Sequence, residues 1–318
     1  MTAGSMILPA LVVLLLTTCA APATATAPSP TRPAATATPL ATPTAKVAKF
    51  ENPNLLVETS WLAQNLSDVN LRILDARPAK DYAAGHIKGA ISLPVENTFN
   101  PTGPAQMAAS ADLIQKVFGE RGVSNDTRVV VYDVGKETKA SRILWTLEYY
   151  GHTKVSVLNG GFAKWQKEDL PVSTEETRPA TTTFTAKADD TKLSTKEKIL
   201  AVLGKPGVAL FDVRSPEEFT GQDVRTKRGG HIPGAVNIDW RELFTKDDPA
   251  VFKSAEELTK MLTAVGVTKD KEVQTYCQTG QRSSVSYLVL RLLGYQKVLN
   301  YDGSWQEWGN DPDVPIEK

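Results

Sequence analysis

The residues best suited to covalent chemistry lie in one short segment, Cys277-Gln278-Thr279-Gly280-Gln281-Arg282. An apolar run that ends at Tyr276 precedes the segment, and apolar residues at helical spacing follow from Ser283, so we predict a loop between a strand and a helix. The first N–H groups of a helix and the positive end of its dipole point toward such a loop. We therefore expect the Cys277 thiol to ionise readily and to act as a nucleophile.

The other five residues of the segment are the candidate substrate-binding residues. Gly280 permits a tight turn, and Arg282 supplies a cation that can hold an oxyanion through two N–H groups. Gln278, Thr279 and Gln281 add backbone N–H groups to a cradle suited to a dianion. A lone cysteine more often only packs in a core, but a glycine turn before a helix, followed by an arginine, favours catalysis at Cys277.

Composition and charge exclude several classes of function. The chain has 318 residues, enough for about two domains, and its 36 basic and 36 acidic residues leave no net charge for binding a polyanion. Its two cysteines and three histidines are too few and too widely spaced for a zinc or iron–sulfur site. We expect no metal and no cofactor.

The first residues are predicted to be an export signal. An apolar run from Met6 to Leu16 is too short for a confident membrane span, and small residues follow it. The Leu16-Thr-Thr-Cys19 segment resembles a bacterial lipoprotein cleavage box, in which Cys19 would carry the lipid. Cleavage as an ordinary secretory signal near Ala20 remains the alternative. We expect an exported protein, periplasmic or at the cell surface, with lipid anchoring favoured over free secretion.

An internal repeat at the scale of a domain organises the rest of the chain. The landmarks of the first copy recur in the same order 137 to 145 residues later. They are Asp75-Ala-Arg77 and Asp212-Val-Arg214; Gly85-His86-Ile87 and Gly230-His231-Ile232; Tyr132-Asp133 and Tyr276-Cys277; and Asn159-Gly160-Gly161 with Trp165 against Tyr301-Asp302-Gly303 with Trp308. We read the paired aspartates, arginines and histidines as scaffold, and Trp165, Trp305 and Trp308 as packing aromatics.

Strands and helices alternate within each copy, which predicts an α/β fold in which a parallel sheet carries helices on both faces. Short apolar runs predict buried strands at 128–132, 155–158, 209–211 and 297–300. Apolar positions on one face predict a helix from Ser283 to Leu293, ended by Gly294. The predicted division is a signal at 1–19, an Ala/Thr/Pro-rich linker at 20–48, a first domain at 49–175, a connector at 176–198 and a second domain at 199–318.

The repeat, the Asp-x-Arg and Gly-His-Ile segments and the Cys-x-x-Gly-x-Arg loop resemble the tandem rhodanese family of sulfurtransferases, from about residue 50 to the C-terminus. The resemblance implies two rhodanese-like domains. In the first, Asp133 stands where the nucleophile would be, so this domain is inactive. It also implies a cycle in which Cys277 takes the outer sulfur of thiosulfate as a persulfide and passes it to cyanide or a thiol.

The single cation of the loop bears on the sulfur donor. Vertebrate thiosulfate enzymes of this family resemble Cys-Arg-Lys-Gly-Val-Thr, and mercaptopyruvate enzymes resemble Cys-Gly-Ser-Gly-Val-Thr. A further substrate-binding arginine of the vertebrate enzymes would fall near Glu218 here. The one charge, Arg282, favours the dianion thiosulfate over mercaptopyruvate. An insertion unique to the second copy, Gly221–Gly229, is either a solvated loop or a basic flap over the site.

Three alternatives remain open. The first is a 3-mercaptopyruvate sulfurtransferase, and the second is a persulfide carrier that receives sulfur from a partner protein. The third is a phosphatase, because related folds use a Cys-x5-Arg loop for phosphate. The present loop, from Cys277 to Arg282, is one residue shorter and forms a tighter cradle. The acceptor and the oligomeric state stay open.

Overall fold

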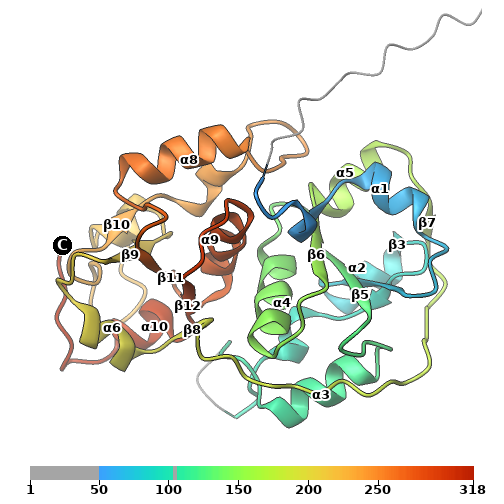
Figure 1. Cartoon of the computed structure of the whole chain (residues 1–318), viewed down its shortest axis with the longest axis horizontal. Helices are drawn as coiled ribbons and strands as arrows, with labels where there is room; N and C mark the ends of the chain where they lie inside the picture. Colours follow the sequence, from blue (N-terminus) through green and yellow to red (C-terminus); the bar gives the residue numbers. More distant parts are fainter. Residues whose placement is uncertain (1–49, 103–105) are drawn as a thin grey trace, which may run out of the picture. The chain divides into compact units, whose positions relative to one another are not determined.

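The computed structural model describes residues 50–102 and 106–318 (Figure 1). The predicted signal at 1–19, with Cys19, and the predicted linker at 20–48 lie outside the described residues. The described chain forms two five-stranded sheets, in the strand orders β1-β6-β5-β2-β4 and β10-β9-β11-β12-β8, and every pairing within them is parallel. The predicted α/β fold with two parallel sheets is confirmed.

The first sheet and its helices come from the first copy of the repeat. Its strands are β1 (Leu56–Val57), β2 (Leu71–Asp75), β4 (Ile91–Ser92), β5 (Arg128–Tyr132) and β6 (Val155–Leu158). Its helices are α1 (Thr59–Gln64), α2 (Ala79–Ala84), α3 (Ala111–Gly119), α4 (Thr138–Tyr149) and α5 (Gly161–Lys167), with 3-10 turns η1 (Pro53–Leu55) and η2 (Val95–Thr98). A short antiparallel pair, β3 (His86–Ile87) and β7 (Val172–Ser173), closes the unit.

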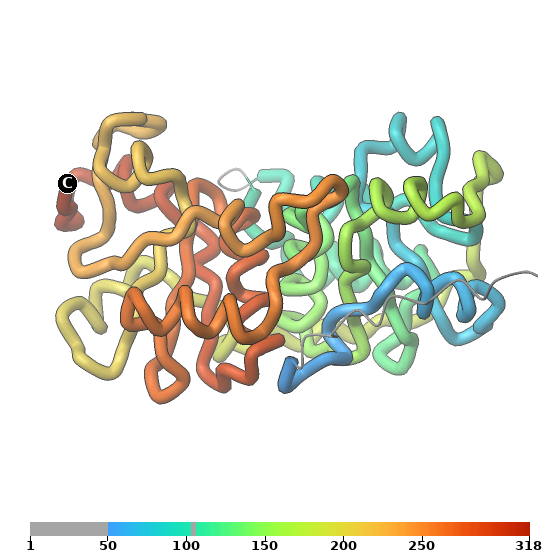
Figure 2. Tube along the Cα trace, turned by 90° about the horizontal axis from the view of Figure 1, so that it is seen from above, coloured from blue at the N-terminus to red at the C-terminus, as the bar shows by residue number. Residues whose placement is uncertain are grey.

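The second sheet repeats this order of elements. Its strands are β8 (Leu193–Ser194), β9 (Val208–Asp212), β10 (Val236–Asn237), β11 (Glu272–Tyr276) and β12 (Val298–Tyr301). Its helices are α6 (Lys196–Val202), α7 (Pro216–Phe219), α8 (Ala255–Ala264), α9 (Gln281–Leu292) and α10 (Ser304–Trp308), with the 3-10 turn η3 (Trp240–Leu243). In Figure 2 the blue-to-green first copy and the gold-to-red second copy follow one another along the chain.

Helices cover both faces of each sheet, because successive strand residues point to opposite sides. On β5, Val129 and Val131 pack with α3 and α4, whereas Val130 and Tyr132 pack with α1, α2 and α5. The second sheet packs against α8 and α9 on one face and against α6 and α10 on the other. Helices α4 and α9 lie side by side, so one core is continuous between the two copies (Figure 1).

Two predicted boundaries differ from the structure. Strand β8 pairs with β12 and α6 begins at Lys196, so the second sheet starts inside the predicted connector at 176–198. Helix α9 starts at Gln281, two residues earlier than predicted, and side chains are buried around most of its circumference. The residues of the predicted apolar face are buried, and the other faces are buried as well because α9 packs against both its own sheet and α4. The helix ends at Leu292, and the predicted terminating glycine, Gly294, follows it with φ = +85°.

The repeated Asp-x-Arg and His residues are confirmed as scaffold. Arg77 donates to Asp75 (2.6 Å) and to the carbonyl of Gly85 (2.7 Å). The second copy has the same bonds, from Arg214 to Asp212 (2.6 Å) and to the Gly230 carbonyl (2.8 Å). The imidazoles stack on aromatic rings, His86 on Tyr82 and His231 on Phe219, while Trp165, Trp305 and Trp308 are buried.

Candidate active site

The loop at Cys277 lies at the carboxyl end of β11, the central strand of the second sheet. Three residues, 278–280, separate Cys277 from the first residue of α9. The ligand sites of open parallel sheets lie at this edge, where strands end and helices begin. The loop lies between β11 and α9 as predicted, except that Gln281 and Arg282 form the first turn of the helix.

Helix α10 holds the first half of the loop. The Trp305 N–H donates to the Cys277 carbonyl (2.9 Å), and the Gln306 N–H donates to the Gln278 carbonyl (2.8 Å). The N–H of Cys277 in turn donates to the Ser304 hydroxyl (3.2 Å). These bonds fix the backbone on which the thiol is carried.

Ser304 was missed from the sequence, and the reason is an error of one residue in the predicted repeat. In the first copy Phe162 N–H donates to the Asp133 carbonyl, as Trp305 N–H does to Cys277. The structural counterpart of Ser304 is therefore Gly161, and not Phe162 as the predicted repeat implied. Gly161 has φ = +55° and Ser304 has φ = +49°, so a serine occupies a left-handed position that a glycine fills in the first copy.

Gly280 is required where it stands. Its φ is +78°, and a Cβ there would lie 2.8 Å from the carbonyl oxygen of Asp302 and 2.9 Å from Nη1 of Arg142. The Gly280 carbonyl accepts hydrogen bonds from Ser284 Oγ (2.8 Å), Asn300 Nδ2 (3.1 Å) and Arg142 Nη1 (3.3 Å). Buried polar side chains therefore hold the turn through the carbonyl of Gly280.

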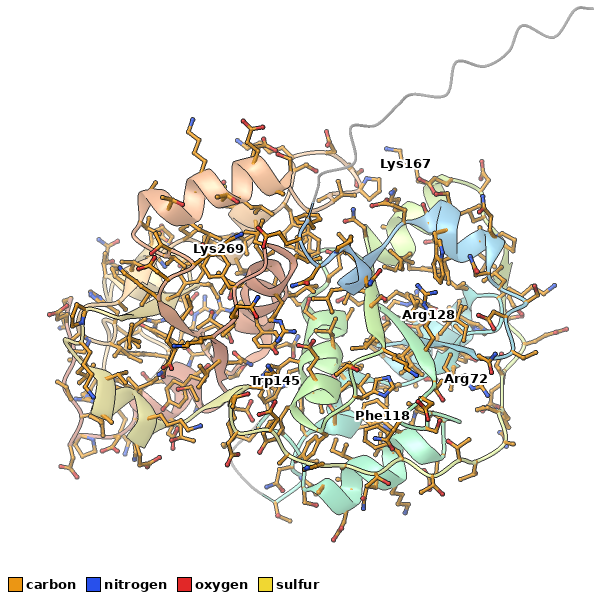
Figure 3. The ribbon with its side chains drawn as sticks, viewed as in Figure 1. Arg72, Phe118, Arg128, Trp145, Lys167 and Lys269 are labelled. Carbon is orange, nitrogen blue, oxygen red and sulfur yellow. The ribbon has the colours of Figure 1, made fainter. Side chains whose placement is uncertain are left out.

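Arg142 reaches this turn from α4 of the first copy. Its side chain is fully buried and forms a salt bridge to Asp302, with Nη1 and Oδ1 2.5 Å apart. Asp302 also accepts a hydrogen bond from the Ala108 N–H (2.7 Å). The guanidinium lies 4.4 Å from the ring of Trp145, which Figure 3 labels on α4. No local sequence signal indicated this contribution of the first copy to the loop.

The environment of Cys277 favours its thiolate. Burial raises the pKa of the thiol, but the charge of Arg282 opposes this effect. Hydrogen bonds from the backbone N–H groups of Thr279 and Ser283 and from the Ser283 hydroxyl also favour the anion, so the pKa lies below its ordinary value. The predicted readiness to ionise has a physical basis in these donors.

Arg282 is not the free cation that the sequence led us to expect. Its Nη1 and Nη2 donate to the two carboxylate oxygens of Glu218, at 2.7 and 2.9 Å. Glu218 therefore occupies the two parallel donors with which this guanidinium was predicted to hold an oxyanion. Glu218 is the third residue of α7, and the Ser215-x-x-Glu218 capping box was the signal in the sequence that could have placed it.

A cleft of about 710 Å³ lies over the loop. Gln278, Thr279 and Arg282 line it, with Glu218, Arg225 and Arg241. Arg225 comes from the insertion at 221–229 and is paired with Asp223, whereas Arg228 of the same insertion donates to backbone carbonyls of the C-terminal segment. Cys277 is fully buried and does not line the cleft, and Gly280 and Gln281 are not among the lining residues either.

The loop of the first copy contains its own carboxyl group. Asp133 occupies the position of Cys277, and its carboxylate accepts hydrogen bonds from the N–H groups of Gly135 (2.9 Å), Lys139 (2.8 Å) and Ala140 (3.3 Å). Two of these donors, Gly135 and Ala140, correspond to Thr279 and Ser283, which face the thiol in the second copy. Loop, helix start and N–H donors thus form an anion cradle in both copies.

The described part of the chain has neither a helix suited to a membrane nor a cluster of metal-ligating side chains. Within residues 50–102 and 106–318, no helix combines the length and apolar character that crossing a membrane requires. Across the same two ranges, no three His, Cys, Asp or Glu side chains come together in a group that could hold a metal ion.

Comparison with known proteins agrees with this architecture. The chain is 36% identical over 269 residues to a thiosulfate sulfurtransferase of Azotobacter vinelandii, covering 84% of this chain and 98% of that protein. It is 38% identical over 289 residues to the sulfur carrier protein TtuD of Thermus thermophilus, covering 85% and 98%. The crystal structure of SseA from Escherichia coli, a 3-mercaptopyruvate sulfotransferase, has a TM-score of 0.72 at 30% identity, covering 79% of this chain and 98% of SseA.

The family assignment follows from a domain profile together with these relatives. The profile of the rhodanese-like domain matches twice, at residues 58–168 and 195–311, and each match covers one sheet apart from its first strand, β1 or β8. The chain therefore belongs to the rhodanese family, with two rhodanese-like domains in tandem.

Proposed function

We propose that this protein is a thiosulfate sulfurtransferase that moves sulfur from thiosulfate to cyanide or a thiol through a persulfide on Cys277. The observation that carries the proposal is the set of N–H donors that the two loops share. In the first copy these donors bind the carboxylate of Asp133, and in the second copy they face the thiol of Cys277. The relatives named as thiosulfate sulfurtransferases, which match nearly their whole length, support the same reaction.

The cycle has two displacements at sulfur. The Cys277 thiolate attacks the outer sulfur of thiosulfate, the S–S bond of thiosulfate breaks, and sulfite leaves with the bonding electron pair. The carbon of cyanide, or a thiolate sulfur, then attacks the outer sulfur of the persulfide. The Sγ–Sδ bond breaks, thiocyanate or a new persulfide leaves, and the thiolate of Cys277 is restored. The atoms and electrons of the two displacements balance without a cofactor or a metal.

Asp133 indicates where the transferred sulfur would lie. Its carboxylate oxygens are two bonds beyond Cβ, as is the outer sulfur of a cysteine persulfide. Oδ2 of Asp133 accepts from the N–H groups of Lys139 and Ala140 at the start of α4. The start of α9 offers the outer sulfur the corresponding donors, and the negative charge of the persulfide is favoured at the positive end of that helix.

The remaining loop residues have distinct proposed roles. Gln278 and Thr279 line the cleft through which thiosulfate enters, and Gly280 keeps the turn tight enough for the N–H groups to converge. Gln281 begins the helix whose dipole faces the sulfur. Arg282 contributes positive charge at the thiolate from within its pair with Glu218.

The test is the formation of thiocyanate by the purified protein from thiosulfate and cyanide, with mercaptopyruvate as the alternative donor. We expect turnover with thiosulfate, its loss in Cys277→Ala, and no change in Cys19→Ala, the matched control at the other cysteine. Turnover with mercaptopyruvate alone would replace thiosulfate by that donor, as the likeness to SseA allows. Turnover of a chromogenic phosphate ester, lost in Cys277→Ser, would favour a phosphatase.

A carrier role is the second candidate, and the similarity to the sulfur carrier protein TtuD favours it. A carrier would acquire a persulfide on Cys277 from a partner protein without turning over either small donor. Mass spectrometry of the intact protein, after incubation with thiosulfate or with a persulfide-bearing desulfurase, separates the two: an added sulfur of about 32 Da from the protein partner alone would support the carrier.

We also propose that the protein is exported and attached to a membrane through a lipid on Cys19, with residues 20–48 as a tether. The apolar run before Cys19 and the Ala/Thr/Pro-rich segment after it support this. The proposed domain limits are those predicted above, except that the second domain begins near β8. Incorporation of a labelled fatty acid, abolished by Cys19→Ala, tests the lipid; release of soluble protein from wild-type cells contradicts it.

A further inference from the structure

Glu218 holds Arg282 more tightly than a surface partner could. The carboxylate is 1% exposed, and both of its oxygens accept from the two Nη atoms of the guanidinium, at 2.7 and 2.9 Å. Such bidentate pairs are strong and restrict the orientation of the arginine. Arg282 supplies positive charge to the cleft beside Cys277. A residue that fixes its guanidinium therefore also limits its effect on the thiolate and on bound anions.

Glu218 is itself held by α7. Its N–H donates to the Ser215 hydroxyl and its Oε2 accepts from the Ser215 N–H, both at 3.3 Å. Arg225 of the insertion approaches the other oxygen, with Nη1 3.7 Å from Oε1. The pKa of Glu218 is lowered because hydrogen bonds and charge from Arg282 outweigh burial, so the carboxylate is charged at neutral pH.

The rest of the cleft follows the same pattern of compensated charge. Arg225 is paired with Asp223, and Arg241 is paired with Asp239. Arg282, Arg225 and Arg241 are therefore each paired with a carboxylate. A cleft built in this way exerts much less pull on a dianion than three free guanidinium groups would.

We propose that Glu218 is a positioning and specificity-determining residue, which fixes Arg282 beside Cys277 and partly cancels its charge so that dianions bind weakly enough to leave. The inference rests on the proposed sulfurtransferase function. Thiosulfate and the departing sulfite are both dianions, and a site with an uncompensated arginine would hold the product as well as the substrate. Glu218 thus limits inhibition by sulfite at the cost of some affinity for thiosulfate.

The experiment compares Glu218→Gln with Glu217→Gln in the full chain. Glutamine serves a capping box as glutamate does, so the first variant removes charge and keeps α7. Glu217 lines the same cleft but is exposed and is not paired with Arg282, so the second removes an equal charge from the same wall. We expect Glu218→Gln to lower the KM for thiosulfate and the inhibition constant of sulfite by about threefold or more, with a smaller effect from Glu217→Gln.

A second readout does not require turnover. The rate of Cys277 alkylation by iodoacetamide, followed against pH in Cys19→Ala protein, reports the thiolate. We expect its midpoint to fall by about half a pH unit in Glu218→Gln and to rise in Arg282→Gln. Equal effects of the two glutamate variants, or a midpoint that rises in Glu218→Gln, would overturn the proposal.

The two readouts separate the two proposals. Absence of thiocyanate from the wild-type protein would reject the proposed function and leave the alkylation series as the test of Glu218. Normal turnover together with an unchanged midpoint in Glu218→Gln would reject the role of Glu218 alone. If Glu218→Gln unfolds, a midpoint that does not rise in Arg282→Gln rejects the proposal.

Discussion

Arg142 of the first domain and Asp302 of the second form a buried salt bridge, with Nη1 and Oδ1 2.5 Å apart. The same guanidinium donates to the Gly280 carbonyl (3.3 Å), inside the loop that carries Cys277, and to the carbonyl of Gln106 (2.8 Å). The first domain has no cysteine at its own loop, yet it supplies a side chain that supports the loop of the second. The first domain therefore contributes structurally to the loop of the second.

Replacing Arg142 by methionine should destabilise the protein, because Asp302 would keep a buried charge without its partner. We expect the free energy of unfolding in urea to fall by about 3–5 kcal/mol, the usual effect of breaking a buried ion pair on one side. The double variant Arg142→Met, Asp302→Asn should recover much of the loss. Thiocyanate formation should stay low in both, since neither restores the bond to Gly280; full recovery in the double variant would contradict this.

Ser304 should separate stability from catalysis. Its hydroxyl accepts from the Cys277 N–H, and its φ of +49° strains any residue with a Cβ. Ser304→Ala keeps the strain and loses the bond, so we expect a loss of about 1–3 kcal/mol in the free energy of unfolding. Ser304→Gly relieves the strain and should lose less. Turnover should fall in both; a glycine variant with wild-type kcat would show that the hydroxyl does not position Cys277.

Gly280→Ala should destabilise the protein by more than a residue with a Cβ at a positive φ usually does. A Cβ at Gly280 would contact Asp302 and Arg142 below 3 Å, whereas nothing lies within 4 Å of one at Gly234, whose φ of +74° is similar. Gly234→Ala is therefore the matched control, with an expected loss of about 1–2 kcal/mol. Gly280→Ala should lose more and should abolish most thiocyanate formation. Equal stability and activity in the two variants would show that the loop relaxes around the added methyl group.

Glu137 should make the first domain less stable as pH rises above the ordinary pKa of glutamate. Burial and the neighbouring Asp133 raise its pKa well above the ordinary value, while Oε1 accepts from the Gly160 N–H and Oε2 is buried without a partner. A raised pKa means that the folded state binds the proton more tightly than the unfolded state does. Stability is therefore full below the ordinary pKa of glutamate and falls as pH rises toward the folded value.

Glu137→Gln removes this dependence and keeps an acceptor for Gly160. We expect equal free energies of unfolding for wild type and variant at pH 4, and a more stable variant at pH 7, measured in urea at both pH values. Glu175→Gln, an exposed glutamate of the same domain, is the control and should show no such difference. A variant that is less stable than wild type at pH 7 would mean that Glu137 is ionised in the folded protein.

The sequence by itself determined the features that depend on local pattern. The repeat, the α/β class, the strand at 128–132 and the position of Cys277 between a strand and a helix were all predicted correctly. Alternation of apolar residues reports which segments form strands and helices, and glycines such as Gly294 report where they end. The aspartate–arginine pairs were identified as scaffold because they recur in both copies of the repeat.

Only the tertiary structure decided which charges remain available at the site. Arg282 pairs with Glu218, 64 residues away, and Arg142 reaches Gly280 across 138 residues. A sequence pattern has no period that links such positions, because their distance is set by how the two sheets and α4 and α9 pack. The strained turn at Ser304 was hidden in the same way, since its role depends on a hydrogen bond from Cys277. Packing therefore set the electrostatics of the loop that the sequence had located.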